Sequence, residues 1–260
     1  MTQTQSFIFL DPEYLQKLGS SLAGAYAAAE PFPHAVIDGF LPEWAAEKIL
    51  ADFPDVQAID WARYDHQHSK KLATDKEAHM AEFTRSAIHQ LNSGVFLEFL
   101  EKLTGIDGLI ADPYLWGGGL HQITRGGFLN IHADFNRYRR LKLDRRLNFL
   151  LYLNRDWKEE YGGHLELWDK TIKKCVQRVL PVFNRAVVFS TTDFSYHGHP
   201  VPLTCPEGWS RKSLALYYYT NGRPVDEITA EHNTLYQKTP EQKKREQKGG
   251  RACWWKRLLK

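Results

Sequence analysis

The chain has 260 residues, 43% of them hydrophobic and 25% charged, which suits one large globular domain or a domain with an appended layer. No apolar run approaches the roughly 18 residues needed to cross a bilayer, which argues against a membrane-spanning protein. The net charge of +3 is uneven, because residues 239–260 carry a net +6 and the rest of the chain is mildly acidic. A mildly acidic body argues against a nucleic-acid-binding core.

The N-terminal residues and the cysteines bear on where in the cell the protein is located. "MTQTQSFIFLDPEYL" has neither a basic segment nor a small-residue cleavage site, so it is not typical of a secretory signal. The three cysteines, Cys175, Cys205 and Cys253, are widely spaced and form no CxxC pair. We expect reduced thiols and a cytoplasmic location.

The first 110 residues are mostly helical in pattern. Residues 11–30 and 41–54 each begin with a Pro at the first helical position, and residues 76–105 carry apolar side chains at helical spacing. Between the first two lies a strand-like segment, "FPHAVIDGF". The histidines of "DHQHSKK" (65–71) sit in a polar stretch, so we predict a solvated loop there in preference to a second metal site. Residues 1–111 are expected to form a helical support segment packed on the core.

From about residue 112 the pattern changes to short strands. The runs "YLWGGGLHQI", "RLNFLLYLN", "GGHLELWD", "VQRVLPVF", "RAVVFST" and "KSLALYYYTNG" are strand-length and separated by Gly, Asn, Asp or Pro. No helical pattern lies between them, which is typical of a β-sandwich or barrel. We therefore predict a mainly β core over residues 112–224 with flanking helices.

After Pro224 the sequence becomes polar and charged. We interpret residues 225–260 as a basic, poorly packed extension with a short amphipathic end, "WWKRLLK". Two Trp and two Leu beside three cations suit either docking on the domain or weak contact of residues 251–260 with an anionic membrane surface. Docking or disorder is favoured, because the segment is short.

The stretch "GGFLNIHADF" raises the possibility of a metal site. His132 and Asp134 are two residues apart in a strand-like segment, so both side chains point to one face. Imidazole with carboxylate is the ligand mixture of a non-haem Fe(II) site, which needs one more His. "FSYHGHP" supplies two candidates, His197 and His199. The pair alone could arise by chance in a chain with 11 histidines.

Two later strands carry polar residues that suit a bound anion. "RKSLALYYY" places Arg211 and Ser213 on one face, and Arg offers a rigid two-pronged donor for a carboxylate. In "RLNFLLYLN", Asn148 and Tyr152 share one face while apolar residues occupy the other. Such a strand suits a barrel wall with a polar interior, since buried Asn and Tyr need hydrogen-bonding partners.

Taken in order, six segments resemble a known family. They are "HAD", "RLNFLLYLNRDW", "GGHLELW", "PVFNRAVVF", "SYHGHP" and "RKS", and they cover about residues 119–220. Their order resembles the Fe(II)/2-oxoglutarate-dependent dioxygenases, specifically the prolyl-4-hydroxylase-like branch. The resemblance implies a double-stranded β-helix, or jelly roll, with helices on one side. It also implies Fe(II), 2-oxoglutarate and O2 as cofactor and cosubstrates.

The resemblance also assigns roles to residues. It implies that His132, Asp134 and His197 hold the iron, with G-x-P-x-P after His197 favouring it over His199. Arg211 would pair with the distal carboxylate of 2-oxoglutarate and Tyr152 would hydrogen-bond to it. We expect Ser213 and Asn148 to take part in binding the same cosubstrate. A Tyr that some relatives place ten residues before the His-x-Asp pair falls on Gln122, so that contact is in doubt. An acid at 134 argues against the halogenating branch.

The resemblance implies a hydroxylase acting on an unactivated C–H, with a prolyl or other peptidyl side chain as the leading substrate. Small molecules and glycans are alternatives, as are a cupin-like metal-binding protein and a catalytically silent scaffold. The Arg211-x-Ser213 and Tyr152 pattern disfavours the cupin, and the complete ligand set disfavours the scaffold. The cationic run from Arg137 to Arg146 would favour an acidic substrate if it rims the site, whereas a solvated loop is the plain alternative.

Overall fold

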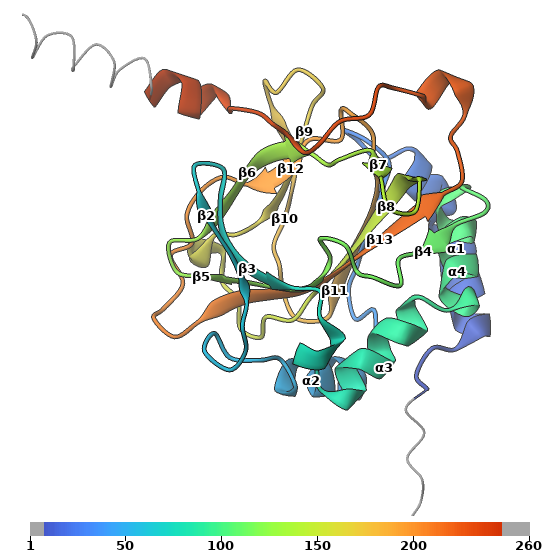
Figure 1. Ribbon diagram of the computed structural model, residues 1–260, viewed down its shortest axis with the longest axis horizontal. Helices are drawn as coiled ribbons and strands as arrows, with labels where there is room; N and C mark the ends of the chain where they lie inside the picture. Colours follow the sequence, from blue (N-terminus) through green and yellow to red (C-terminus); the bar gives the residue numbers. More distant parts are fainter. Residues whose placement is uncertain (1–7, 246–260) are drawn as a thin grey trace, which may run out of the picture.

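The computed structural model describes residues 8–245, in which strands surround a barrel axis and helices lie outside the barrel (Figure 1). The helices α1 Pro12–Ala27, α2 Glu43–Ala51, α3 Glu82–Leu91 and α4 Gly94–Thr104 precede most of the strands. Helix α1 begins at Asp11, whose carboxylate accepts hydrogen bonds from the amides of Glu13 and Tyr14. This cap explains why the helix begins where the sequence predicts.

The strands form one antiparallel sheet that is curled into two layers. They are β1 His34–Ile37, β2 Ala62–His66, β3 Ser69–Thr74, β4 Ile110–Ala111, β5 Gly119–Thr124, β6 Phe128–Ala133, β7 Arg137–Tyr138, β8 Leu143–Tyr152, β9 Leu165–Trp168, β10 Cys175–Val179, β11 Arg185–Ser190, β12 His197–His199, β13 Ser210–Thr220 and β14 Leu235–Tyr236.

Strands β11, β8, β13 and β5 form the larger layer, and β6, β12, β9 and β10 form the smaller one. Strand β3 pairs with both β5 and β6 and so connects the two layers along one side. From β5 to β13 successive core strands alternate between the layers, except for β9 and β10, which pair with each other in the smaller layer. This alternation is expected for a double-stranded β-helix. The prediction of a mainly β jelly-roll core is confirmed.

The helices cover the outer face of the larger layer, and the main hydrophobic core lies between them. Leu147, Phe149 and Leu151 of β8 belong to this core, and the ring centroid of Phe149 lies 5.2 Å from that of Phe96 in α4. Their neighbours on β8 therefore face the barrel interior, because side chains alternate along a strand. The larger layer is thus apolar outside and carries polar groups inside.

Two regions of the N-terminal segment differ from the sequence predictions. The helical pattern over residues 76–105 is a short 3-10 turn, Glu77–His79, followed by α3 and α4, which are separated at Asn92 and Ser93. Residues 65–71 are not a solvated loop: they belong to the hairpin of β2 and β3, and β3 is inserted between β5 and β6. The hairpin escaped prediction because β2 is exposed along its whole length and shows no apolar alternation.

The segment after Pro224 also packs more closely than the sequence suggests. Strand β14 pairs with β6, placing Tyr236 opposite His132. Farther along, Thr239 is buried, and Gln242 donates a hydrogen bond to Asn130. The expectation of a poorly packed extension is therefore wrong for this stretch. Cys253 and the tail at 251–260 lie outside the described residues.

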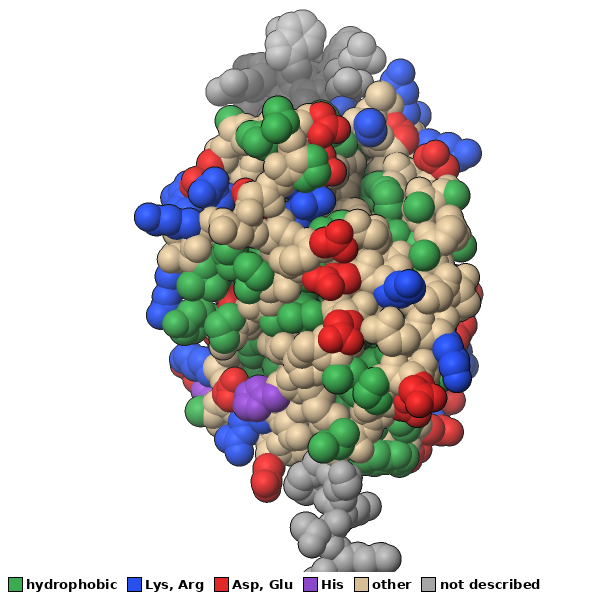
Figure 2. Space-filling model, turned by 90° about the vertical axis from the view of Figure 1, so that its right-hand side faces the viewer, with side chains coloured by type: hydrophobic (Ala, Val, Ile, Leu, Met, Phe, Trp, Pro, Cys, Tyr) green, Lys and Arg blue, Asp and Glu red, His purple; other side chains and the backbone are tan. Residues whose placement is uncertain are grey.

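The surface on the side of α1 and α4 mixes side chains of all kinds. Figure 2 shows acidic side chains in a line down the middle of this face, with basic ones to either side and hydrophobic ones between. Within residues 8–245, none of the helices combines the length and apolar character needed to cross a membrane.

Candidate metal centre and cosubstrate pocket

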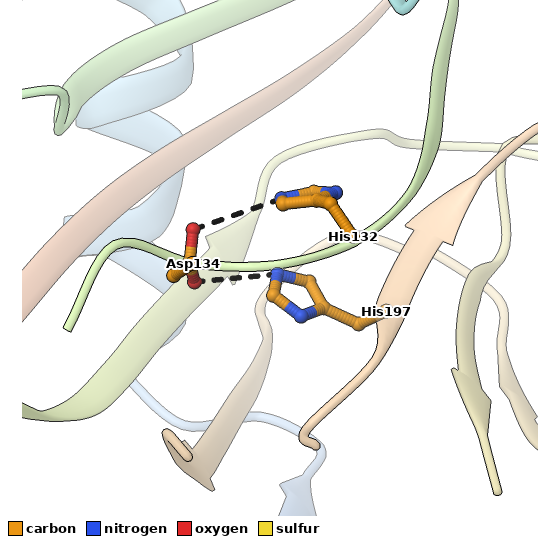
Figure 3. A group of neighbouring side chains, drawn as sticks. All are labelled: His132, Asp134 and His197. Atoms are coloured by element: carbon orange, nitrogen blue, oxygen red, sulfur yellow. Dashed lines mark ion pairs between the residues drawn. The ribbon is translucent and has the colours of Figure 1, made fainter. Parts of the chain in front are cut away.

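Three side chains that are candidate metal ligands converge between β6 and β12. His132 lies near the end of β6, Asp134 follows that strand, and His197 pairs directly with His132 across the two strands. Their ligand atoms all lie within 4.8 Å of one another. Figure 3 shows the two carboxylate oxygens directed at the two imidazoles, with Oδ1 3.6 Å from His132 Nε2 and Oδ2 3.5 Å from His197 Nε2.

Backbone hydrogen bonds orient both imidazoles. Nδ1 of His132 lies 2.8 Å from the carbonyl oxygen of Asn130, and Nδ1 of His197 lies 2.9 Å from that of Ser195. A carbonyl can only accept, so each Nδ1 carries a proton and donates it, and Nε2 is the ring nitrogen that faces Asp134. Burial and the neighbouring His132 lower the pKa of His197 to about 4, which keeps this ring neutral. Neutral Nε2 donors are the form that binds a metal.

Asp134 is held as a carboxylate by the residues behind it. Burial alone would raise its pKa, but Arg145 and the two histidines outweigh burial and hold the pKa well below the usual value. Arg145 Nη2 lies 3.1 Å from Asp134 Oδ2, and Asn148 donates to the same oxygen at 2.8 Å. Asn148 in turn accepts from Arg145. The structure thus places Asn148 against the candidate metal ligand Asp134.

A β-bulge explains why Arg145 faces this site. Tyr218 of β13 pairs with Leu147, but the next residue, Tyr219, pairs with Arg145, which leaves Arg146 as an extra residue in β8. Simple alternation would put Arg146 beside Asn148, whereas the bulge turns Arg145 to that face. Arg145 is therefore a functional candidate that the sequence pattern missed, and Arg146 lines a separate cavity.

His199, the alternative third ligand, lines the same cavity but is not in the cluster of three. It pairs with Leu129 instead of His132, and the register shifts between the two histidines. Gly198 between them leaves no room for a side chain, since a Cβ there would lie 2.8 Å from the carbonyl oxygens of Leu129 and Asn130. This close approach brings β12 onto β6 and sets His197 against His132.

A second group of polar side chains, Arg211 and Ser213 of β13, lines the cavity, with the buried Tyr152 of β8 behind Arg211. Arg211 is buried, donates from Nε to the Gly163 carbonyl at 2.8 Å and from Nη2 to the Tyr152 hydroxyl at 3.1 Å. Its guanidinium also lies over the Tyr152 ring, 4.7 Å from the centroid. Ser213 lines the cavity beside them. These contacts fix the guanidinium, which is what recognition of a carboxylate requires.

Gln122 does not contribute to the cavity lining. Its side chain is buried and donates to the Ser210 hydroxyl at 2.8 Å, while its neighbours His121 and Ile123 face the cavity. His164 is likewise outside the lining: it contacts Glu159 at 2.6 Å and Arg178 at 3.2 Å, and burial lowers its pKa. Both residues therefore have structural contacts of their own.

The cavity that joins these groups has a volume of about 210 Å³. Part of its wall comes from segments that the sequence patterns did not connect with the site. Tyr64 and Lys71 reach it from the β2–β3 hairpin, and Thr234 and Tyr236 reach it from the C-terminal segment. His68 of the hairpin stacks on Tyr236 at a centroid distance of 4.3 Å, so the two segments meet at this wall.

Comparisons with known proteins agree with this geometry. A family model described as "2OG-Fe(II) oxygenase superfamily" matches residues 118–219, which include the histidine–aspartate cluster, Tyr152 and Arg211. Residues 118–219 belong to the 2OG-Fe(II) oxygenase superfamily. The prediction of this family, with its cofactor Fe(II) and cosubstrate 2-oxoglutarate, is confirmed.

The relatives of this oxygenase domain include prolyl hydroxylases. A prolyl 3-hydroxylase, OGFOD1 of Mus musculus, is 27% identical over 201 residues, which is 73% of this chain and 33% of that protein. The chain thus spans about a third of the length of this curated relative. A prolyl-4-hydroxylase from Pseudomonas putida is 18% identical with a TM-score of 0.55, covering 78% of this chain and 100% of that one.

A further structural neighbour is a prolyl hydroxylase from Trichoplax adhaerens, solved with a peptide fragment of the hypoxia inducible factor oxygen degradation domain. It is 18% identical, has a TM-score of 0.53, and covers 80% of this chain and 91% of that one. Likeness at this level of identity reflects the shared fold. The family model and the similarity to OGFOD1 are the sequence findings that support the predicted prolyl-4-hydroxylase-like branch.

Proposed function

We propose that the protein is an Fe(II)- and 2-oxoglutarate-dependent hydroxylase of a prolyl or other peptidyl side chain. The observation that carries this proposal is the cluster of His132, Asp134 and His197, with both Nε2 atoms directed at the carboxylate, in one cavity with Arg211. Two imidazoles and one carboxylate suit Fe(II) and leave coordination positions open.

In this proposal each residue has a defined task. His132, Asp134 and His197 hold the metal, and Arg145 with Asn148 keep Asp134 ionised and oriented. Arg211 and Tyr152 receive the distal carboxylate of 2-oxoglutarate. Bound Fe(II) with 2-oxoglutarate and O2 supplies the oxidising power to hydroxylate an unactivated C–H, with succinate and CO2 as the other products. The walls from β2–β3 and β14 limit access of water.

A peptide substrate is supported by a second cavity at the edge of the first. This neighbouring cavity, of about 380 Å³, shares Phe135 and Thr234 with the metal cavity and is lined by aromatic and cationic side chains. Arg137 lies 3.9 Å from Asp144, and Arg139 pairs with Glu231, so two of its arginines already have carboxylate partners. Arg140 stacks on Tyr114 at 3.7 Å from the ring centroid.

The relatives named above as prolyl hydroxylases support proline as the residue modified.

The test is turnover by the Fe(II)-loaded full chain. Proline-containing peptides, free amino acids and glycans would be offered with 2-oxoglutarate, while succinate formation and a +16 product are measured. We expect succinate coupled to a +16 proline in a peptide. Turnover of a glycan or free amino acid instead would change the substrate class and keep the chemistry. Failure to convert 2-oxoglutarate at all would contradict the proposed function.

We also propose three functional regions: a support segment (1–111), a catalytic core (112–224) and a C-terminal extension (225–260). The packing of α1–α4 on the larger sheet layer supports the first assignment, although β3 and Lys71 also reach the cavity. A cytoplasmic location is proposed as well, since Cys175 and Cys205 are free thiols.

A further inference from the structure

Lys71, on the β2–β3 hairpin, places its ammonium group in the cavity that contains the candidate metal ligands. It lies on β3, between the positions where this strand pairs with β6 and with β5, and it lines the cavity together with Asp134, Arg145 and Arg211. The preceding residue, Lys70, is exposed, as expected from alternation along the strand. The two lysines therefore form a matched pair, one inside the barrel and one in solvent.

Each of the other two cations in the cavity has polar protein partners, whereas Lys71 has none in residues 8–245. Arg145 contacts Asp134 and Asn148, and Arg211 contacts Gly163 and Tyr152. The contact of the Lys71 ammonium is with the ring of Tyr64, at 5.1 Å from the centroid, and it has neither an ion pair nor a hydrogen bond within the described chain. Lys71 is half-buried, and an ammonium that is partly removed from water with no carboxylate in ion-pair contact indicates an anionic ligand.

His199 provides a second, independent observation at the same place. It is 4% exposed and lines the cavity, yet neither ring nitrogen has a hydrogen-bond partner in the described residues. Each ring nitrogen of a buried imidazole is a hydrogen-bonding group, and leaving both without a partner is costly. A polar group of a ligand would satisfy both His199 and Lys71.

The charges in the cavity favour the hydroxylated substrate as the source of this ligand. Asp134 is the one acidic residue that lines the cavity, and it already faces Arg145 and the two histidines. In the proposed function the distal carboxylate of 2-oxoglutarate neutralises Arg211, and its other end is at the metal. Lys71 then remains without a counter-charge.

We propose that Lys71, with His199 in the same cavity, binds a carboxylate of the substrate, so that the preferred substrate carries an acidic group close to the proline or other residue that is hydroxylated. This inference rests on the proposed function and deepens it. It differs from recognition by the arginines of the neighbouring cavity, because Lys71 lies inside the barrel with the metal ligands.

The experiment measures binding without turnover. The full chain is loaded with Zn(II), which has no redox chemistry, and with 2-oxoglutarate. Dissociation constants are measured by calorimetry and ligand-observed NMR for matched acid and amide probes: Ac-Pro-Asp-NH2 against Ac-Pro-Asn-NH2, and Ac-Asp-Pro-NH2 against Ac-Asn-Pro-NH2. We expect the acid of at least one pair to bind about tenfold more tightly, as for a charge-assisted hydrogen bond.

The lysine variants decide the assignment. Lys71→Met should abolish the preference for the acid, and Lys70→Met should keep it. The 2-oxoglutarate dissociation constant should change less than threefold in Lys71→Met but rise at least tenfold in Arg211→Met. The inference is overturned if the wild type shows no preference for an acid, if the preference survives in Lys71→Met, or if Lys71→Met weakens 2-oxoglutarate as much as Arg211→Met does.

These outcomes are separate from those that concern the proposed function. Absence of succinate formation by the Fe(II)-loaded wild type would contradict the hydroxylase itself, whatever the Zn(II)-loaded protein binds. Normal succinate formation with no preference for the acidic probes would contradict the role of Lys71 and leave the hydroxylase in place.

Discussion

The two sides of the metal cavity differ in how their polar groups are satisfied. Toward β8 and β13, the guanidinium of Arg211 is fixed by Gly163 and Tyr152. Toward β3 and β12, the side chains of Lys71 and His199 have no hydrogen-bond partner within residues 8–245. A donor that the protein already holds in place suits a cosubstrate that is the same in every reaction cycle. Side chains without a protein partner suit a substrate whose polar groups would complete their hydrogen bonds. We infer that the first side serves the cosubstrate and the second serves the substrate.

The largest expected effect separates the three proposed metal ligands from His199, which we place on the proposed substrate side. His132→Ala, Asp134→Ala or His197→Ala should each abolish stoichiometric Fe(II) binding and turnover, because two remaining ligands cannot hold the ion in this geometry. His199→Ala, in the same cavity and only two residues from His197, should keep its iron. Metal content by elemental analysis and succinate formation measure both effects. If His199→Ala lost the metal while His197→Ala kept it, the two histidines would exchange roles.

The next effect tests the cosubstrate side. Arg211→Ala removes the charge and the two-pronged donor, so we expect the KM for 2-oxoglutarate to rise by about 10- to 100-fold. Arg211→Lys keeps the charge and should raise the KM less, with Tyr152→Phe between the two. The control is Arg178→Ala, since Arg178 contacts His164 and Glu166 outside this cavity. An unchanged KM in Arg211→Ala would place the anchor elsewhere.

The cosubstrate side of the cavity was largely predictable from the sequence. The metal cluster and the Arg211–Tyr152 pair lie on core strands, where alternation fixes which side chains share a face. His132 with Asp134, and Arg211 with Ser213, were therefore brought together by spacing alone. Their partners on other strands could be named only through the resemblance to a family.

The substrate side depends on interactions that leave little trace in the sequence. Lys71 reaches the cavity because β3 is inserted between β5 and β6, and this insertion depends on pairing between segments far apart in the chain. Arg145 faces Asp134 because of a single extra residue in β8. Tyr236 forms part of the wall because a polar segment adds a short strand to β6. Alternation and composition predict none of these three placements.

The smallest expected effect is a change with pH in the preference for acidic over amide probes, caused by the titration of Lys71. Burial lowers the pKa of Lys71 to about 8, although Asp134 opposes the shift; Arg145 and Arg211 act in the same direction as burial. A lysine is charged below its pKa, so the preference for acidic probes should be full near pH 7 and decline as the pH rises through 8. At pH 9 only about a tenth of the Lys71 side chains in the unliganded protein are still protonated, while the Asp carboxylate of the probe stays ionised throughout.

This decline can be separated from the titration of the other groups around the cavity. The groups that face Lys71 include Tyr64 of the hairpin, His121 of β5 and His199 of β12, besides the charged residues named above. Lys71→Arg keeps a cation at every pH tested, because a guanidinium does not titrate in this range. We therefore expect the ratio of amide to acid dissociation constants to fall severalfold between pH 7 and pH 9 in the wild type and to stay flat in Lys71→Arg. An equal decline in both proteins would assign the pH dependence to a neighbour and remove the ammonium of Lys71 from substrate recognition.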